Sequence, residues 1–570
     1  MRPMRFSEFI RKSRTLRRLV RGYRSRTSAY PRWSKLLGVD GGELRLRTAT
    51  RAPRRVLIAT TLGGYWAGVT LESALALALR MRGAAPEVLL CDGALAACQL
   101  CEIRAFENAA DFSAHGPQPT LCQNCHRGGA ALYRGIDVPI QRVSELVRAH
   151  ERAECAALAS GLEFDAIAAF ERDELRIGEH ALAGALRFFA RGTLAGEPHG
   201  ESVLRRFFHA SLVMSCAMRR LFAARRYDAA VFHHGIYVPQ GIVGEVARAS
   251  NVRVVNWTPS YRRGTFIFSH GDSYHHTLLT EPTASWERMP WSDEEAAELA
   301  AYLKSRWAGS QDWIWFHNKP QESPPELARA IGADDGRPVI ALLTNVIWDA
   351  QLHYAANAFA SMMDWLLETV EYFRSRSNLR LVIRVHPAEI RGTLPSRERV
   401  ADELARRAPP LSENVTLIGP DHELSTYALI AHANATLIYG TKTGVEVAAT
   451  GKPVIVAGEA WVRGKGFTLD AANRAEYRAL LDRLPLASLD AVQLERARRY
   501  AYHIFFRRMI PLEFFAPTGS DPPFRFTSTK GWRALEPGAS AGLDVICAGI
   551  LDGAPFIYPA ERLGWPRAAT

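Results

Sequence analysis

The chain has 570 residues, of which 48% are hydrophobic and 23% charged, an ordinary composition for a folded enzyme with more than one core. No apolar run reaches the ~18 residues of a membrane span, and no signal-peptide core follows the N-terminal charges, so we expect a cytoplasmic protein. The net charge is +12, but residues 1–36 hold twelve Lys and Arg against one acid, Glu8, and carry +11 of it. The nearly neutral remainder argues against nucleic acid as a partner.

Residues 1–50 are predicted to form a basic amphipathic tail. On a helical wheel its apolar residues fall on one side, and arginines cover the rest. These apolar residues are Phe6, Phe9, Ile10, Leu16, Leu19, Val20 and Tyr23. The pattern is typical of a helix on anionic lipid, so we expect residues 1–36 to hold the protein on the inner face of the cytoplasmic membrane. The alternatives are a solvated basic arm and an arm that packs on the protein's own body.

The region 51–285 alternates between strand and helix patterns. A buried-strand pattern at 54–61 is followed by a glycine-containing turn at 62–68, a helix pattern, and a second strand pattern at 87–93. The same kind of series recurs at 227–235, 239–250 and 252–260. Such βαβ units predict a Rossmann-like N-terminal domain.

The N-terminal domain contains a Cys-rich insertion at 91–126. Cys98-x₂-Cys101 is followed, after twenty residues, by Cys122-x₂-Cys125. This is the spacing of a closed four-thiolate zinc site, in which the metal has a structural rather than a catalytic role. Cys91 or His126 could replace one ligand. Buried thiols without a metal, or an iron–sulfur cluster, are the alternatives.

Several residues at strand ends of this domain are candidates for binding an acceptor. The backbone amides of Gly63 and Gly64 can approach a ligand closely. His234, which we favour over His233 because Gly235 follows it, is the candidate general base. Arg262 and Arg263 are candidates for contacting phosphate on a lipid-linked acceptor. A structural His pair and exposed arginines are the alternatives.

A polar, Trp-rich linker at 286–335 separates this domain from a second α/β series at 336–515, and residues 516–570 are a C-terminal extension. The second series contains one long helix pattern, at 353–376. Its strand patterns are at 337–345, 379–387, 414–420, 435–440 and 452–458. We therefore expect an α/β fold of two Rossmann-like domains that face each other across a cleft, with ligands bound at the carboxyl ends of both sheets.

The stretch YGTKTGVEVAATGKPVIVAG, at 439–458, is not a Walker loop, because six residues separate Gly444 from Gly451 and Pro453 occupies the position of the Mg²⁺-binding hydroxyl. The turn from Thr441 through Lys442 and Thr443 to Gly444 is placed to bind an anion at a helix start. Glu446 is then placed to accept hydrogen bonds from a ribose diol. Simple capping of the helix is the alternative role for Glu446.

Four motifs, in order, resemble the bacterial capsule polysaccharide biosynthesis proteins, a group of GT-B-type glycosyltransferases that includes transferases of acidic eight- and nine-carbon sugars. The motifs are LLTNVIWDAQ (342–351), LRLVIRVHPAE (379–389), GTKTGVEVAATGKPVIVAG (440–458) and VRGKGFTLD (462–470). The resemblance implies metal-independent catalysis, donor binding by the C-terminal domain, and acceptor binding by the N-terminal domain.

Within those motifs, His386 is the candidate that offsets charge on the departing nucleotide. The remaining donor-binding candidates are Asn345, Asp349, Arg384, Glu389, Lys465 and Gly466. We expect a glycosyltransferase that takes a nucleotide-activated sugar donor and a lipid-linked or oligosaccharide acceptor, with no cofactor in catalysis. The alternatives are a CDP-alcohol phosphotransferase of the teichoic-acid type and a non-catalytic scaffold that binds nucleotide sugars.

Overall fold

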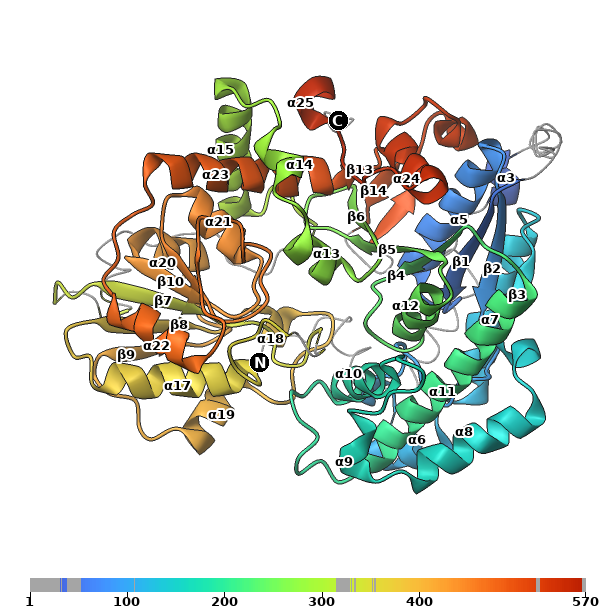
Figure 1. Cartoon of the computed structure of the whole chain (residues 1–570), viewed down its shortest axis with the longest axis horizontal. Helices are drawn as coiled ribbons and strands as arrows, with labels where there is room; N and C mark the ends of the chain where they lie inside the picture. The colour runs from blue at the N-terminus through green and yellow to red at the C-terminus, as the bar shows by residue number, and fades with distance from the viewer. Residues whose placement is uncertain are drawn as a thin grey trace, which may run out of the picture.

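The computed structural model describes residues 31, 33–37, 53–106, 108–313, 329, 331–332, 335–350, 352, 355–518 and 523–565. They form two α/β domains, each built around one sheet (Figure 1). The predicted pair of Rossmann-like domains is therefore confirmed. The predicted N-terminal helix, with its membrane contact, lies outside the described residues, which include only 31 and 33–37 of the predicted tail.

The N-terminal domain contains a seven-stranded sheet in the order β13-β6-β5-β4-β1-β2-β3. Five neighbouring strands are parallel, β6 pairs antiparallel with β5 at one edge, and β13 pairs antiparallel with β6. The strands are β1 (Arg55–Thr61), β2 (Ala85–Leu90), β3 (Ile140–Arg142), β4 (Ala229–His233), β5 (Arg253–Pro259), β6 (Thr265–His270) and β13 (Ile510–Pro511).

Alternation along β1 explains why both faces of this sheet are covered. Val56 and Ile58 belong to one core cluster and Leu57 and Ala59 to another, because successive strand residues point to opposite faces. One face is covered by α5 (Trp66–Met81) and α7 (Pro119–Arg134), and the other by α10 (Ile177–Phe189), α11 (Gly200–Ala224) and α12 (Gln240–Ala249). The shorter helices α6 (Ala109–His115), α8 (Ala149–Gly161) and α9 (Phe164–Ile167) surround α11.

The C-terminal domain contains a six-stranded parallel sheet in the order β12-β11-β10-β7-β8-β9. Its strands are β7 (Val339–Leu343), β8 (Arg380–Arg384), β9 (Val415–Ile418), β10 (Ala435–Ile438), β11 (Val454–Val456) and β12 (Leu469–Asp470). Its helices are α17 (Met362–Arg374), α18 (Ala388–Arg391), α19 (Val400–Arg407), α20 (Thr426–His432), α21 (Thr443–Ala449), α22 (Arg474–Asp482) and α23 (Ala491–Tyr502).

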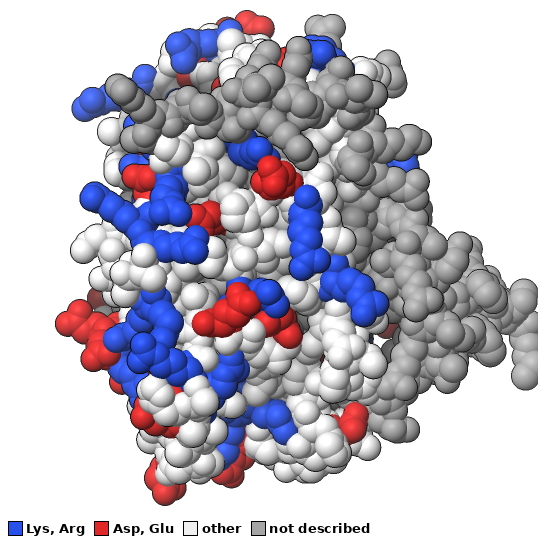
Figure 2. All heavy atoms as spheres, turned by 90° about the vertical axis from the view of Figure 1, so that its right-hand side faces the viewer, with Lys and Arg blue, Asp and Glu red and all other residues white. Residues whose placement is uncertain are grey.

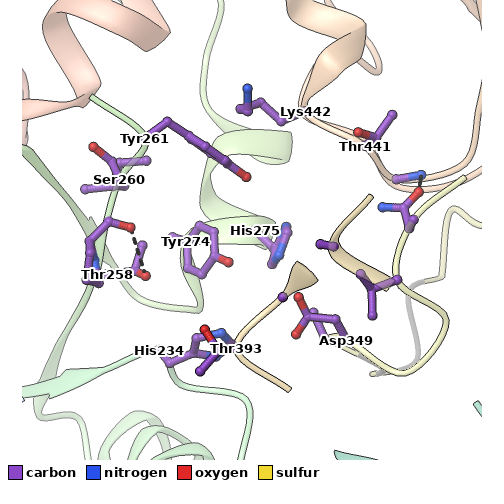
Figure 3. Close-up of a pocket in the computed structure, with 18 of the residues that line it drawn as sticks. His234, Thr258, Ser260, Tyr261, Tyr274, His275, Asp349, Thr393, Thr441 and Lys442 are labelled. Atoms are coloured by element: carbon purple, nitrogen blue, oxygen red, sulfur yellow. Dashed lines mark hydrogen bonds between the residues drawn. The ribbon is translucent and has the colours of Figure 1, made fainter. Parts of the chain in front are cut away.

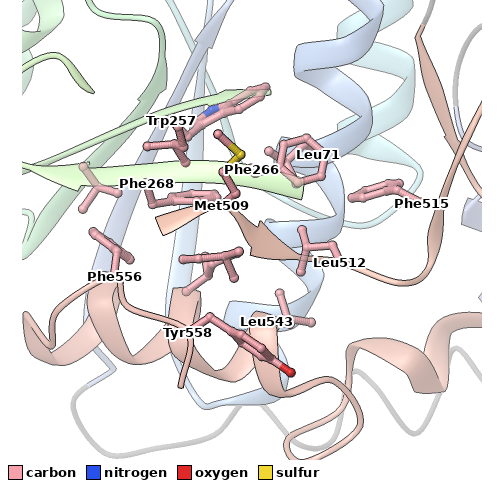
Figure 4. Packing of buried hydrophobic residues seen from close by; sticks show 14 of the residues in the cluster. Leu71, Trp257, Phe266, Phe268, Met509, Leu512, Phe515, Leu543, Phe556 and Tyr558 are labelled. Carbon is pink, nitrogen blue, oxygen red and sulfur yellow. The ribbon is translucent and has the colours of Figure 1, made fainter. Parts of the chain in front are cut away.

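The last part of the chain returns to the N-terminal domain, which corrects the predicted boundary at residue 515. After α23 and a π-helical turn, η3 (His503–Arg508), β13 joins the N-terminal sheet beside β6. The elements that follow are β14 (Phe515–Pro517), β15 (Phe524–Phe526), η4 (Gly531–Leu535), α24 (Ala541–Asp552) and α25 (Ala560–Leu563). Figure 4 shows their apolar side chains, including Leu512 and Leu543, packed against Leu71, Trp257 and Phe266.

The segment between the domains also has secondary structure. It contains α13 (Tyr274–Thr280), α14 (Ala284–Glu287) and α15 (Asp293–Ala308). A capping box at Ser292 and Glu295 begins α15, and Gly309 ends it in the left-handed conformation that glycine favours. The predicted linker is therefore partly a helix, and α15 places Arg306 beside the C-terminal domain.

The described part of the predicted tail, residues 33–37, packs on the body of the protein. Helix α3 (Trp33–Leu37) buries Trp33, whose Nε1–H donates to Ser73 Oγ at 2.8 Å. The outer face of the N-terminal domain carries basic and acidic side chains side by side (Figure 2), as expected for a body of nearly balanced charge. No helix in the described ranges is long and apolar enough to cross a membrane.

Candidate functional site

A cavity of about 610 Å³ lies between the two domains and is lined by residues that follow the carboxyl ends of both sheets (Figure 3). The N-terminal wall comes mainly from the segments after β4 and β5. The C-terminal wall comes from the segments after β7, β8 and β10. Ligands of open α/β sheets bind at this edge, so the cavity is the candidate functional site.

The C-terminal wall brings together six of the predicted donor-site residues. They are Asn345, Asp349, His386, Thr441, Lys442 and Thr443. The Asn345 side chain accepts a hydrogen bond from the Gly440 amide at 3.3 Å, which joins the loops after β7 and β10. The segments that follow the parallel strands of this sheet therefore lie side by side at the cavity, as predicted from the sequence.

Lys442 is a buried cation at the edge of this wall. Its ammonium forms an ion pair with Glu446 and lies 4.0 Å from the centre of the Tyr261 ring, in a cation–π contact. Burial and, to a smaller extent, the neighbouring Arg306 lower the pKa of Lys442 to about 8, against the opposing effect of Glu446. Below that pH the ammonium is charged and can attract an anion in the cavity.

Glu446 lies behind Lys442, outside the set of residues that line the cavity. It is 4% exposed, and its Oε2 accepts from Arg306 Nε at 2.8 Å and from the Tyr427 hydroxyl at 2.8 Å. Although burial opposes ionisation, Arg306 and Lys442 hold the pKa of Glu446 at about 2. The structure thus gives this carboxylate internal partners, namely Lys442, Arg306 and Tyr427, and does not place it in the cavity wall where a ribose would bind.

His386 lines the cavity as a neutral imidazole. Its Nδ1 accepts a hydrogen bond from the Ala388 amide at 3.0 Å, so the proton of the neutral ring is on Nε2. Burial, reinforced by Arg384 and Lys442, lowers the pKa of His386 to about 4. His386 can therefore act as an N–H donor to an oxygen atom at neutral pH.

The N-terminal wall is rich in imidazole and phenol groups. His234 has a φ of 63° and stacks on Tyr237, with the ring centres 5.1 Å apart. Burial lowers the pKa of His234 to about 4, and the carboxylate of Asp349 opposes this shift. The Tyr237 hydroxyl donates to Asp349 Oδ1 at 2.8 Å, which links the two walls.

Three predicted donor-site residues have structural contacts instead. Arg384, 3% exposed, donates to the backbone carbonyls of Gly419 and His422 and holds the loop after β9. Glu389, 2% exposed, accepts from the Val400 amide at 2.9 Å. Neither side chain lines the cavity, so the structure does not bring these two residues together with the other donor-site candidates.

Lys465 is the third predicted donor-site residue with structural contacts. Its ammonium donates to the Leu279 and Glu281 carbonyls at 2.8 and 3.1 Å. Two glycines also pack away from the cavity. A Cβ on Gly444 would meet Ile438 at 2.5 Å, and a Cβ on Gly466 would meet Arg496 at 2.8 Å. These contacts join elements of the fold and leave none of the three residues in the cavity wall.

The predicted acceptor-side arginines and glycines likewise lie outside the cavity wall. Arg262 is buried among aromatic rings, with its guanidinium 3.5 Å from the centre of Trp565, and Arg263 donates to the Asp312 carbonyl at 3.2 Å. A Cβ on Gly63 would lie 2.4 Å from the Cys125 carbonyl, and the Gly64 amide donates to Cys125 Sγ at 3.0 Å. The Gly63–Gly64 turn therefore packs against α7, and only the next residue, Tyr65, reaches the cavity.

The four predicted zinc ligands line a second, much smaller cavity together with Cys91. In their present positions, no three His, Cys, Asp or Glu side chains in the described part of the chain lie close enough to hold a metal ion. The zinc site therefore stays a prediction.

Several lining residues lie outside the sequence predictions. They include Tyr65, Arg187, Tyr237, Tyr261, Tyr274, His275, Arg306 and Trp461. Tyr261 follows the carboxyl end of β5, so its position after a strand end was a usable signal. Tyr274 follows β6, which runs antiparallel to β5 and ends at the opposite edge of the sheet, so the same rule does not place it at the cavity. Arg306 comes from α15 and contacts a residue 140 positions away, for which the sequence offers no local signal.

Residues 327–496 match the model of the family described as "Capsule polysaccharide biosynthesis protein", which confirms the predicted resemblance over that part of the chain. A search of curated proteins gave no match. Among solved structures, KpsC of Thermosulfurimonas dismutans, a beta Kdo 2,4 transferase, is 14% identical over 55% of this chain and 88% of that chain, with a TM-score of 0.33. The glycosyltransferase SnogD from Streptomyces nogalater is 13% identical over 79% of this chain and 95% of that chain, with a TM-score of 0.22.

Proposed function

We propose that this protein, whose residues 327–496 match the capsule polysaccharide biosynthesis family, is a glycosyltransferase that uses a nucleotide-activated sugar. The observation that carries the proposal is the meeting of two different walls at one cavity. The C-terminal wall offers cations and an N–H donor for an anionic leaving group, and the N-terminal wall offers aromatic and imidazole groups for a carbohydrate.

The donor's phosphates are assigned to the C-terminal wall. Lys442 is charged at neutral pH and lies in a mostly water-excluded position, where its attraction for a phosphate is stronger than at the surface. His386 supplies a neutral N–H donor from the adjacent loop. In this proposal Lys442 and His386 offset the charge that develops on the departing nucleotide.

The acceptor hydroxyl is assigned to the N-terminal wall, with His234 as the general base. A neutral imidazole can accept the proton, but its low pKa makes the resulting imidazolium costly. Asp349 reduces that cost, because its negative charge favours the protonated ring. The base and its charge partner come from different domains, so proton removal depends on both walls being in place.

The acceptor is proposed to be an oligosaccharide or a lipid-linked glycan at the inner face of the cytoplasmic membrane. The support is the family match together with the +11 charge of residues 1–36. The tail would bring the catalytic body to a surface where such an acceptor is held, while the transfer itself takes place in the cavity.

A panel of nucleotide-activated sugars and CDP-alcohols, with the matching free nucleotides, tests this proposal. We expect one donor class to raise the melting temperature and to be consumed when a glycan acceptor is added. Lys442→Met should abolish the shift, whereas Lys304→Met, a change to an exposed lysine of α15, should keep it. Consumption of a CDP-alcohol alone would establish the phosphotransferase alternative, and binding with no turnover of any donor would establish the scaffold.

A further inference from the structure

Five cysteines surround one small cavity on the N-terminal domain, separate from the central cavity. They are Cys91, Cys98, Cys101, Cys122 and Cys125. They come from three pieces of chain: the end of β2, the loop before α6, and α7. The cavity has a volume of about 30 Å³, which is room for a single ion or water molecule.

One sulfur pair already has the separation that a metal requires. Cys98 Sγ and Cys101 Sγ lie 3.8 Å apart. Two thiolates bound to a tetrahedral zinc ion at Zn–S distances of about 2.3 Å are about 3.8 Å from each other. The other three cysteines line the same space.

A backbone amide points at one of these sulfurs, since the Gly64 amide donates to Cys125 Sγ at 3.0 Å. N–H donors of this kind stabilise negative charge on sulfur and fix the orientation of a ligand, as outer-shell groups do in metal sites.

We propose that four of these five thiolates, Cys98 among them, hold one tetrahedral zinc-class ion. The site would tie the loop after β2 to α7 beneath the Gly63–Gly64 turn. It would also support the central cavity, since Gln99, inside the Cys98-x₂-Cys101 turn, lines that cavity and its carbonyl accepts from Arg187 at 2.6 Å. The inference is independent of the proposed transferase activity.

The experiment is metal analysis of the full chain purified without chelators, followed by replacement of the ion with Co²⁺. We expect about one ion per chain and a Co²⁺ spectrum with intense thiolate charge-transfer bands and tetrahedral d–d bands. Cys98→Ser should lose at least about half of the bound ion when folded. The matched control is Cys155→Ser, because Cys155 and Cys216 also place two sulfurs 3.8 Å apart, but between α8 and α11.

Two results would overturn the proposal. One is the lack of a stoichiometric ion in the unaltered chain, both as purified and after incubation with Zn²⁺ or Co²⁺ under reducing conditions. The other is equal metal content in folded Cys98→Ser and the unaltered chain. If Cys98→Ser fails to fold, the Co²⁺ spectrum of the unaltered chain decides, since an octahedral spectrum without thiolate bands would exclude the site.

Discussion

Lys442 of the C-terminal domain lies 4.0 Å from the centre of the Tyr261 ring of the N-terminal domain. A second contact across the cavity joins Tyr237 to Asp349. Both contacts use groups that line the cavity, so the relative position of the domains and the shape of the cavity depend on the same side chains. Changes to these residues should therefore affect ligand binding before they affect either domain's core.

The pH dependence of donor binding should report the ionisation of Lys442. Its pKa is lowered to about 8, and a lysine loses its positive charge as the pH rises through its pKa. We therefore expect donor affinity to decrease above about pH 8, by ~10-fold or more if one charged hydrogen bond is lost. Calorimetry between pH 6.5 and 9.5 measures this. In Lys442→Met, affinity should be low at every pH, and a profile like that of the unaltered protein would exclude Lys442 as the titrating group.

His386 should contribute more to turnover than to donor binding. Its Nε2–H is placed to meet charge that develops as the nucleotide departs, and loss of one such donor costs ~10²-fold in kcat. We expect His386→Ala to lower kcat by about that factor and to change donor Kd by less.

His422 provides the matched control for His386. It also follows a strand of the same sheet, and its Nδ1 also accepts an amide two residues later, from Leu424 at 3.0 Å. His422 is exposed and does not line the cavity, so His422→Ala should leave kcat unchanged. Equal losses in the two variants would mean that the effect comes from the turn rather than from the cavity.

The sequence predicted the position of the site because parallel strands end at one edge. Asn345, His386 and Thr441 are far apart in the chain, yet each follows a strand of one sheet. Arg384 does not reach the cavity wall because it is still within β8, where neighbouring loops enclose its side chain and supply carbonyl acceptors. Position at a strand end predicts the edge of the sheet, but it does not predict which side chains are enclosed.

The ion cluster behind the cavity could not be predicted, because it depends on contacts between distant segments. The spacing of Lys442 and Glu446 is that of an i,i+4 pair, which the sequence does show. Arg306 and Asp312, however, come from the predicted linker and add a second cation and carboxylate. Arg306 pairs with both Glu446 and Asp312, and no local sequence pattern signals these contacts.

Glu446→Gln should reduce stability because it leaves two buried cations without their shared carboxylate. Removing one partner of a buried ion pair costs ~3–5 kcal/mol. Urea unfolding measures the change, with Glu495→Gln as the control, since Glu495 pairs with Arg499 on the surface and such pairs contribute little. Equal midpoints for Glu446→Gln and the unaltered protein would show that the cluster adds no stability.

The lowered pKa of Glu446 also predicts how the free energy of unfolding changes as the pH falls. The folded-state pKa of Glu446 is lowered from 4.5 to about 2, so the folded protein binds fewer protons there than the unfolded chain. Its contribution is therefore complete above about pH 4.5 and is lost as the pH falls toward 2. Stability measured from pH 6 to pH 3 should fall less in Glu446→Gln than in the unaltered protein, and parallel curves would contradict the assignment.

A deletion that removes the basic tail should end before Trp33, because Trp33 belongs to the folded core. Its indole is buried and donates to Ser73, so deletion of residues 1–36 would remove a core side chain together with the charges. Deletion of residues 1–30 keeps Trp33 and still removes ten Lys and Arg and the single acid Glu8, a net of +9. Trp33→Ala in the full chain should lower stability by ~3–5 kcal/mol and leave the charges in place.

These two variants separate membrane contact from folding. The chain without residues 1–30 should lose binding to anionic vesicles and keep its melting temperature and its activity on a soluble acceptor. Binding by the full chain should weaken as salt rises from low to physiological strength, because screening reduces the attraction of the tail for lipid headgroups. Neutral vesicles are the control. Equal binding of anionic vesicles by the full and shortened chains would show that the tail is not the membrane contact, and the contact would then lie elsewhere on the protein.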